Sequence, residues 1–193
     1  MLFRSGALPA PLEIVEERSV GPGLGADSIE AGKIAAIIGM ILVCIFMVLI
    51  YGSFGLIANI SLIANLFIII ALLGTIGATL TLPGIAGIIL TVGMAVDANV
   101  LIFERIKEEI KGERNNLIAF DSGYEKSKTA VIDANITTLL AAIILFFMGS
   151  GPVKGFSVTL GVGIFTTLFS VYFIARLLTS LYVTKNKNKE SII

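Results

Sequence analysis

Residues 34–96 read IAAIIGMILVCIFMVLIYGSFGLIANISLIANLFIIIALLGTIGATLTLPGIAGIILTVGMAV, without a single Asp, Glu, Lys or Arg. The only charge from there to Phe103 is Asp97. About 20 apolar residues span the hydrocarbon core of a bilayer, so this run is long enough to cross it three times. It predicts an all-α polytopic membrane protein.

Glycine and proline divide the apolar sequence into shorter helices. We predict breaks at 51–55, 82–84 and 148–152, because each of these segments contains residues that end or turn helices. Two further apolar stretches follow the first run, and each contains one internal charge, Asp133 or Arg176. The prediction is five transmembrane helices, near residues 33–50, 57–80, 85–103, 129–147 and 155–183.

The composition excludes several classes of protein. Of the 193 residues, 56% are hydrophobic and 15% are charged, whereas a soluble domain is about 45–50% apolar and about 25% charged. The net charge of +0 argues against nucleic-acid binding. The absence of His removes His-based catalytic triads and most catalytic zinc sites, and Cys44, the one cysteine, cannot form a disulfide or a metal site alone. We expect no cofactor and no bound metal.

Lys and Arg residues near helix ends indicate which side of the membrane is cytoplasmic. They are concentrated in segment 104–128 and in the tail 184–193, while the other links contain only Lys154. Both basic segments are therefore placed in the cytoplasm, and with five crossings residues 1–32 lie outside. Within 104–128, apolar residues at helical spacing predict that the third helix continues or bends along the membrane surface, as a solvated connector or as a docking surface for a partner.

Residues 1–32 form a polar, acidic segment without the features of a signal peptide. Either the first helix carries this short tail across the membrane, or the segment is the end of an external domain of a longer protein. We favour the second interpretation. Alternation at Leu12, Ile14 and Val20 suggests a strand, and residues 21–25 have the composition of a linker into the membrane.

Two carboxylates lie within predicted helices, where an ionised side chain is costly. Asp97 is about six residues, or roughly 9 Å, from the cytoplasmic end of its helix. Because Asp at a helix centre costs at least ~2.5–3.5 kcal/mol, we interpret Asp97 as a proton or ion site, with a structural hydrogen bond between helices as the alternative. Asp133 lies near the start of its helix, where it is either a helix cap or a second member of the site.

The motif Asp-Ala-Asn occurs twice, at 97–99 and at 133–135. Antiparallel neighbouring helices that enter and leave one cytoplasmic segment would bring the two copies to a similar depth. Two carboxylates close together cannot both ionise easily, so such a site could take up and release a proton. Thr137 and Thr138 add hydroxyl groups next to the second copy.

Other polar and small residues are better explained by helix packing. Asn59 and Asn65 are expected to form hydrogen bonds between helices. Arg176 is either a counter-ion to Asp97 or, more simply, a side chain that extends to the cytoplasmic headgroups. Two stripes of small and polar residues predict close approach of helices: Ala71, Gly74 and Ala78, and Thr159, Gly163, Thr166 and Ser170.

The sequence of residues 93–109, GMAVDANVLIFERIKEE, resembles the fourth transmembrane helix of the SecD family of the bacterial Sec export machinery, part of the RND superfamily. Residues 132–138, IDANITT, resemble the fifth helix of that family, and residues 149–156, GSGPVKGF, resemble the turn that follows it. Residues 6–27 are similar to the segment by which the family re-enters the membrane after its external domain.

The resemblance implies five helices of a six-helix half that pairs with a similar SecF half in the bacterial cytoplasmic membrane. It implies an accessory subunit of the Sec translocation channel, not an enzyme, that uses the proton-motive force to help secrete unfolded preproteins. Membrane lipids are a further expected partner. The proton-relay residues that it implies are Asp97, Asn99, Asp133, Asn135 and Thr137.

Two other functions remain open. One is a different RND-type exporter, of lipid or drug, which would carry the aspartate but lack the long match at 93–109. The other is a structural assembly subunit without ion coupling, in which Asp97 only forms hydrogen bonds between helices. The coupled ion is a proton or a sodium ion, because a carboxylate with amide and hydroxyl neighbours suits either.

Overall fold

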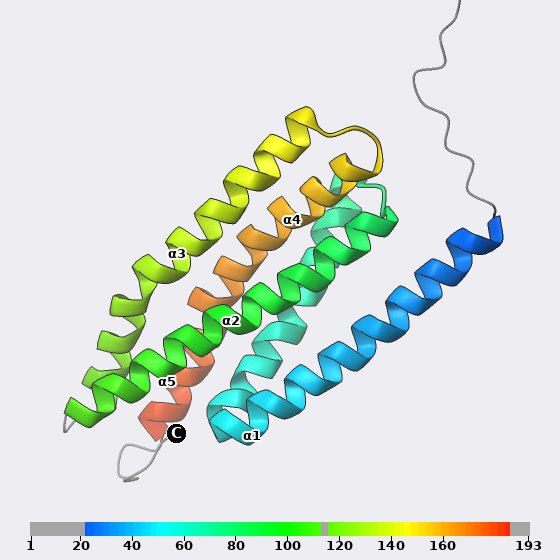
Figure 1. The fold of residues 1–193 in the computed structure, drawn as a ribbon. Helices are drawn as coiled ribbons and strands as arrows, with labels where there is room; N and C mark the ends of the chain where they lie inside the picture. The colour runs from blue at the N-terminus through cyan, green and yellow to red at the C-terminus, as the bar shows by residue number, and fades with distance from the viewer. Residues whose placement is uncertain (1–21, 113–115, 186–193) are drawn as a thin grey trace, which may run out of the picture.

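The computed structural model of this protein describes residues 22–112 and 116–185, and the regular structure in this part of the chain is helical (Figure 1). Four stretches within it are long and apolar enough to cross a membrane: Ile29–Ile76, Leu82–Gly112, Leu117–Met148 and Pro152–Lys185. This agrees with the predicted all-α polytopic class. The helices are α1 (Pro22–Ile76), α2 (Leu82–Gly112), α3 (Asn116–Met148), α4 (Pro152–Phe169), the π-helix η1 (Ser170–Ala175) and α5 (Arg176–Lys185).

The first helix, α1, reverses direction at Gly52, inside the predicted break at 51–55. Gly52 has φ 52° and ψ −120°, a conformation that glycine adopts without a steric penalty. The chain folds back there, so α1 consists of two arms (Figure 1). The Asn59 Nδ2 atom donates a hydrogen bond to the Cys44 carbonyl oxygen at 3.0 Å and ties the two arms together. The bonding role predicted for Asn59 is confirmed.

The second arm of α1 ends earlier than the predicted range 57–80. Gly77 has φ 67° and occupies the left-handed position of a Schellman motif, in which the Ala78 N–H donates to the Leu73 carbonyl oxygen at 3.0 Å. These bonds satisfy carbonyl groups that the last turn would otherwise leave without partners. The predicted end at residue 80 is therefore wrong, because Gly77 terminates the helix first.

The next helix, α2, begins at Leu82, inside the predicted break at 82–84. The Thr81 hydroxyl oxygen accepts a hydrogen bond from the Gly84 N–H at 3.2 Å and caps α2. Pro83 then lies in the first turn, where its missing N–H has no intrahelical partner to lose. Residues 82–84 begin a helix instead of separating two helices, which corrects the prediction.

Glycine and proline act as predicted at the third break. Gly151 has φ 49°, and Pro152 opens α4 immediately after it. At the other end of the described chain, residues 22–25 are helical, so the linker predicted at 21–25 is wrong for those residues. The strand suggested between Leu12 and Val20 lies outside the described residues.

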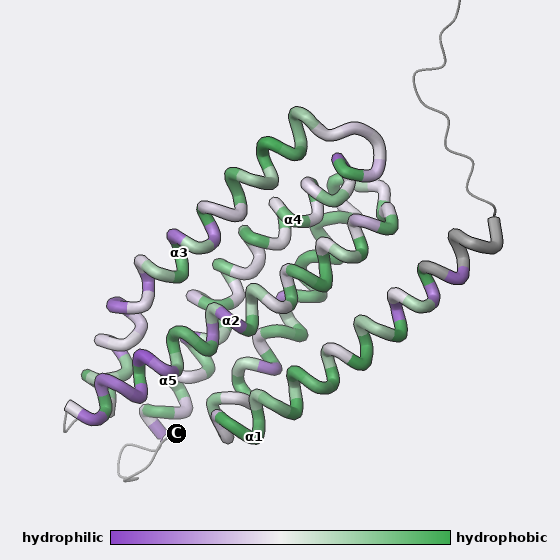
Figure 2. Tube along the Cα trace, viewed as in Figure 1, coloured by the Kyte–Doolittle hydropathy of each residue, from purple (hydrophilic) through white to green (hydrophobic). Residues whose placement is uncertain are grey.

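Helices α2 and α3 extend well beyond the transmembrane ranges predicted for them. α2 continues to Gly112 and α3 starts at Asn116, so segment 104–128 consists mainly of the adjoining ends of two helices. The predicted continuation of the third helix is confirmed. Hydrophilic residues gather at these two ends, whereas the middle of the bundle is predominantly apolar (Figure 2).

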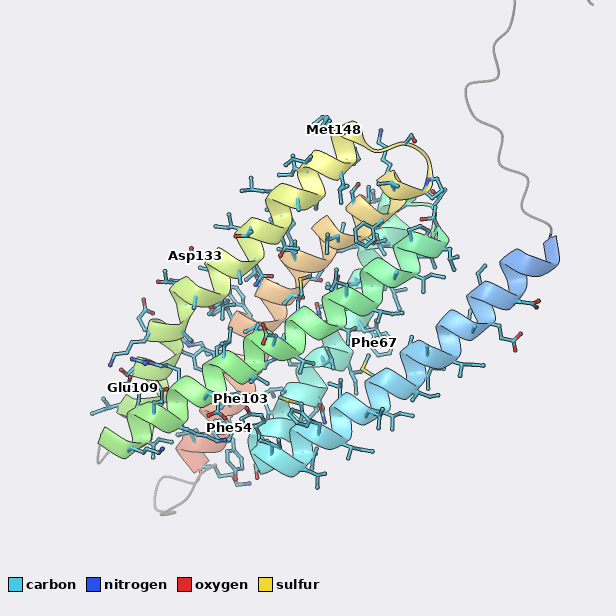
Figure 3. All side chains as sticks on the ribbon, viewed as in Figure 1. Phe54, Phe67, Phe103, Glu109, Asp133 and Met148 are labelled. Carbon is cyan, nitrogen blue, oxygen red and sulfur yellow. The ribbon has the colours of Figure 1, made fainter. Side chains whose placement is uncertain are left out.

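Large aromatic side chains form the core at the end of the bundle that contains the Gly52 turn. Phe54 lies edge-on to Phe103, with ring centroids 5.3 Å apart, and Tyr51 lies 5.7 Å from the same ring. Figure 3 shows Phe54 and Phe103 in the region where α1 and α2 meet. Phe120 and Tyr124 of α3 pack 4.9 Å apart in the same buried cluster. Such ring pairs stabilise helix contacts beyond the area they bury.

Helices α2 and α4 approach closely because glycines face threonines across their contact. A Cβ atom on Gly163 would collide with Thr91, and one on Gly87 would collide with Thr159. Small residues allow this approach, which maximises van der Waals contact where the bilayer provides no hydrophobic driving force between helices. Burial of four residues confirms the predicted packing stripe on this helix: Thr159, Gly163, Thr166 and Ser170.

Polar side chains join the second arm of α1 to α4 and η1. The Ser61 Oγ atom donates to the Ser170 carbonyl oxygen at 3.1 Å, and the Ser170 Oγ atom donates to the Ser61 carbonyl oxygen at 2.8 Å. The Asn65 Nδ2 atom donates to Thr167 Oγ1 at 3.3 Å, which confirms the prediction for Asn65. All four side chains are buried, and these bonds replace the water that a bilayer core lacks.

The outer surface of the bundle is largely apolar. Leu49, Phe147 and Met148 are 79%, 79% and 83% exposed, as suits side chains that face lipid. Ala71 and Gly74 are exposed as well, and nothing described lies within 4 Å of a Cβ placed on Gly74. Among the described residues, the small-residue stripe predicted there does not pack against another helix.

The close contact between α2 and α4 predicts a large effect of one methyl group. Gly163→Ala should lower the free energy of unfolding by about 1–3 kcal/mol, because the new Cβ must displace Thr91 and its helix. Gly161→Ala on the same helix is the matched control, since nothing lies within 4 Å of its Cβ position. Unfolding of both variants in detergent measures the difference, and equal stabilities would contradict the contact.

Candidate functional site

Asp97 of α2 is exposed and lines a small, partly open cavity between α2 and α3. The cavity has a volume of about 170 Å³, which is room for a few water molecules at roughly 30 Å³ each. Asp97, Asn135 and Thr138 supply its polar groups. The remaining lining is apolar: Met94, Ala98, Leu101, Val131 and Ala134.

Asn135 is the buried polar side chain of this cavity. It is 5% exposed, and its Nδ2 atom donates to the Val131 carbonyl oxygen at 2.7 Å. Its Oδ1 atom is buried without a hydrogen-bond partner among the described residues. An unsatisfied buried acceptor costs about 1–3 kcal/mol, so the amide favours a donor inside the cavity, such as water.

The second hydroxyl of the Thr-Thr pair, not the first, faces the cavity. Thr138 lines it and donates from Oγ1 to the Ala134 carbonyl oxygen at 3.1 Å, which leaves its lone pairs available. Thr138 is three residues after Asn135, and residues at this spacing share one face of a helix. That spacing is the signal in the sequence that selects Thr138 over Thr137.

The other polar members of the repeated motif, Asn99 and Asp133, do not line this cavity. Asn99 is 1% exposed, donates from Nδ2 to the carbonyl oxygen four residues earlier at 2.9 Å, and has a buried Oδ1 atom without a partner in the described part. Asp133, labelled on α3 in Figure 3, is exposed, and Thr137 Oγ1 donates to its carbonyl oxygen at 2.9 Å. The structure brings Asp97 to Asn135, and Asp133 does not line the cavity.

The carboxylate of Asp97 has no salt-bridge partner among residues 22–112 and 116–185. Arg176, for which a counter-ion role is the less favoured alternative, instead places its Nη2 atom 3.5 Å from Asp121 Oδ1 and its guanidinium 5.5 Å from the Tyr124 ring. Its partial exposure agrees with a side chain that extends toward headgroups. Within the same ranges, no cluster of three His, Cys, Asp or Glu side chains could hold a metal ion.

Glu109 ties α2 to α3 beyond the cavity, toward the connection between the two helices (Figure 3). Its carboxylate accepts hydrogen bonds from Lys126 Nζ at 2.7 Å and Ser122 Oγ at 3.0 Å, and lies 3.1 Å from an Arg105 nitrogen. Gly123 allows close approach at this level, because a Cβ there would collide with Ile106 of α2. These contacts set the separation of the two helices that enclose the cavity.

An apolar helical bundle with an exposed carboxylate at a partly open cavity between two of its helices is typical of a polytopic membrane protein with a polar site. The family described as "Protein export membrane protein SecD/SecF, C-terminal" matches residues 7–185. The chain therefore belongs to the SecD/SecF family of protein export membrane proteins and corresponds to the C-terminal membrane part of SecD.

Named relatives support this assignment. The chain is 56% identical over 190 residues to a protein translocase subunit SecD of Rickettsia prowazekii, covering 98% of this chain and 37% of the relative. It is 51% identical over 192 residues to a SecD of Magnetococcus marinus, covering 100% of this chain and 36% of the relative. The chain thus spans little more than a third of these bacterial proteins. Its membership of this family and its apolar helices indicate that it is a bacterial membrane protein.

Solved structures show the same arrangement of helices. One is a crystal structure of SecDF, a translocon-associated membrane protein, from Thermus thermophilus, with a TM-score of 0.85 and 41% identity over 89% of this chain and 24% of the other. Another is SecDF in a super-membrane-facing form, with a TM-score of 0.82 and 42% identity over 97% of this chain and 26% of the other. This chain and the two SecDF structures therefore share both the fold and a substantial part of the sequence.

The cavity predicts a local difference in thiol reactivity along α3. In a Cys44→Ser background, Thr138→Cys should react with a small water-soluble thiol reagent at least about tenfold faster than Ala142→Cys, because only a hydrated thiol ionises readily. Ala142 is the matched control, since it lies one turn further along the same helix and is 3% exposed. Equal labelling rates at the two positions would mean that the cavity is dry.

Proposed function

We propose that this chain is the membrane part of an accessory subunit of the Sec preprotein translocase, and that it uses the proton-motive force to promote secretion across the cytoplasmic membrane. The observation that supports this most directly is the position of Asp97. It is an unpaired carboxylate, among the described residues, in a cavity with an amide and a hydroxyl. Membership of the SecD/SecF family supplies the link to protein export.

The proposed mechanism is a change of charge at Asp97. Water in the cavity, oriented by Asn135 and Thr138, delivers a proton to the carboxylate from one side and removes it on the other. The neutral acid is tolerated in a low-dielectric environment, whereas the carboxylate requires water or donors around it. The preferred separation of α2 and α3 therefore differs between the two states. The transported ion is a proton, with sodium as the alternative, and no cofactor is needed.

The other proposed relay residues, Asn99, Asp133 and Thr137, lie outside the cavity at positions consistent with a role in the relay. Asn99 carries a buried amide oxygen without a described donor, as Asn135 does, and so marks a second polar point along α2. Asp133 and Thr137 lie on an exposed face of α3, where they would meet water or a neighbouring subunit. We propose that they pass protons toward the cavity and do not share a proton with Asp97 directly.

The proposed topology has five crossings. Gly52 divides α1 into two arms, and each arm is long enough to span the hydrocarbon layer. The Gly52 turn, the adjoining ends of α2 and α3, and the end of α5 all lie at one end of the bundle (Figure 1). Lys and Arg are concentrated there, so this end is proposed to be cytoplasmic and the start of α1 to be outside.

The proposed partners follow from the family and the exposed surfaces. A SecF half would pair with this bundle, and the Sec translocation channel would adjoin the complex. Unfolded preprotein would be handled by regions of the longer protein, and lipids would cover the apolar outer faces. A structural role without ion coupling is the competing function, and the charge of Asp97 discriminates between the two.

The central test neutralises Asp97 in the full-length protein. Asp97→Asn keeps the size and polarity of the side chain but removes its charge and its ability to take up a proton, so proton-dependent secretion should be abolished while membrane insertion and partner binding persist. Secretion of a reporter preprotein measures export, and co-purification from the membrane measures insertion and partner binding.

Glu108→Gln is the control for this variant. It removes a carboxylate that is exposed near the cytoplasmic end of α2 and pairs with Arg105, outside the cavity. Secretion should remain near the wild-type level. If Asp97→Asn also exported normally, ion coupling through this residue would be refuted and a structural role favoured.

The topology can be tested independently by labelling from one side. In a Cys44→Ser background, a reagent confined to the outside should label Asp27→Cys and should not label Lys111→Cys, both of which are exposed positions. Labelling of both positions after the membrane is permeabilised provides the control. The reverse pattern would overturn the proposed orientation.

A further inference from the structure

A second cavity opens at the cytoplasmic end of the bundle, between the start of α3 and the segment formed by η1 and α5. Its volume is about 560 Å³, and it shares no lining residue with the cavity at Asp97. Its polar lining comes from Asp121, Tyr172, Arg176 and Ser180. Phe173 and Leu177 contribute apolar walls.

A positive and a negative group lie side by side in this cavity. The Arg176 Nη2 atom is 3.5 Å from Asp121 Oδ1, which is too long for a strong hydrogen bond. The two side chains are 44% and 70% exposed. Most of the five N–H donors of the guanidinium and the lone pairs of the carboxylate therefore remain available to a ligand. The Tyr124 ring, 5.5 Å from the guanidinium, holds Arg176 in place.

An exposed apolar face leads from this charged pair along the helix toward the membrane interior. Phe169 and Phe173 stack with ring centroids 5.1 Å apart, and Phe173 and Leu177 are 65% and 60% exposed. These residues recur every four positions, so they form one continuous stripe. A ligand for this site must combine two opposite charges at one end with a hydrocarbon chain at the other.

We propose that this cavity binds phosphatidylethanolamine. Arg176 contacts the phosphate, Asp121 accepts hydrogen bonds from the ammonium group, and one acyl chain lies along Phe173 and Phe169. The charge pattern selects this lipid, because the anionic headgroup of phosphatidylglycerol offers Asp121 no cation, and the quaternary ammonium of phosphatidylcholine offers it no N–H donor. The role of the site is independent of proton uptake at Asp97.

The depth of the pair agrees with a headgroup site. Asp121 lies in the second turn of α3 and Arg176 opens α5, which lies at the same end of the bundle as the polar ends of α2 and α3 (Figure 2). The Tyr172 hydroxyl donates to the Lys128 carbonyl oxygen at 3.5 Å across the same gap. An Arg at this depth reaches the interface with its charged end, while its stem and neighbours remain in the apolar layer.

The test measures which lipids the full-length protein retains. Wild-type protein is placed in nanodiscs with equal amounts of phosphatidylethanolamine, phosphatidylglycerol and phosphatidylcholine, extracted in mild detergent, and analysed by native mass spectrometry. Phosphatidylethanolamine should be enriched over both other lipids. Arg176→Gln should reduce its retention by about three- to tenfold, because a charge-assisted contact at a partly exposed site is lost.

Asp121→Asn is the discriminating variant. It removes the negative charge and keeps the shape, so the preference should shift from phosphatidylethanolamine toward phosphatidylglycerol. Lys185→Gln, an exposed position at the end of α5 outside the cavity, is the control and should leave the lipid ratio unchanged. The ratio is measured within one sample, so a partial loss of folded protein does not alter it. Equal retention of all three lipids by the wild type, or an unchanged ratio in Asp121→Asn, would overturn the proposal.

Discussion

The absence of water from the bilayer core is the constraint on which the rest of this structure depends. Each polar group at that depth has to find a partner inside the protein. Ser61 and Ser170 meet this requirement by bonding to each other's backbone, and the Asn65 Nδ2 atom does so by donating to Thr167 Oγ1. The same constraint makes the amide oxygen of Asn135 informative, since it lies at the cavity and no described residue donates to it.

The helical class, two of the three breaks and the central aspartate could be predicted because each depends on local composition. Charge is scarce in this sequence, so Asp97 stands out without any knowledge of packing. The end of α1 could not be located in the same way, because Gly77 and Pro83 both interrupt helices and only the backbone shows which of them does so. The sequence pattern of one helix also does not show which other helix it packs against. The small-residue stripe at Gly74, which is exposed in this structure, is an example.

The two copies of Asp-Ala-Asn show how packing assigns different roles to the same tripeptide. α2 contacts α1, α3, α4 and η1, whereas α3 lies at the edge of the bundle and contacts α2, α4 and α5. Both asparagines bond back to the preceding turn and are buried. Only the copy on α2, however, directs its aspartate into the cavity. Neighbouring helices therefore distinguish the two copies.

The π-helix η1 has a geometric consequence for the charged pair of Arg176 and Asp121. One additional residue in a turn advances everything that follows by about 100° around the helix axis. The stripe that packs against neighbouring helices reaches Ser170, the first residue of η1, and buried residues recur beyond it at Ala175, Thr179 and Val183. Arg176 directly follows η1 on the exposed side, where its Nη2 atom lies 3.5 Å from Asp121 Oδ1. The wider turn thus resets the phase of the helix, so that one face stays packed and the opposite face stays open on both sides of η1.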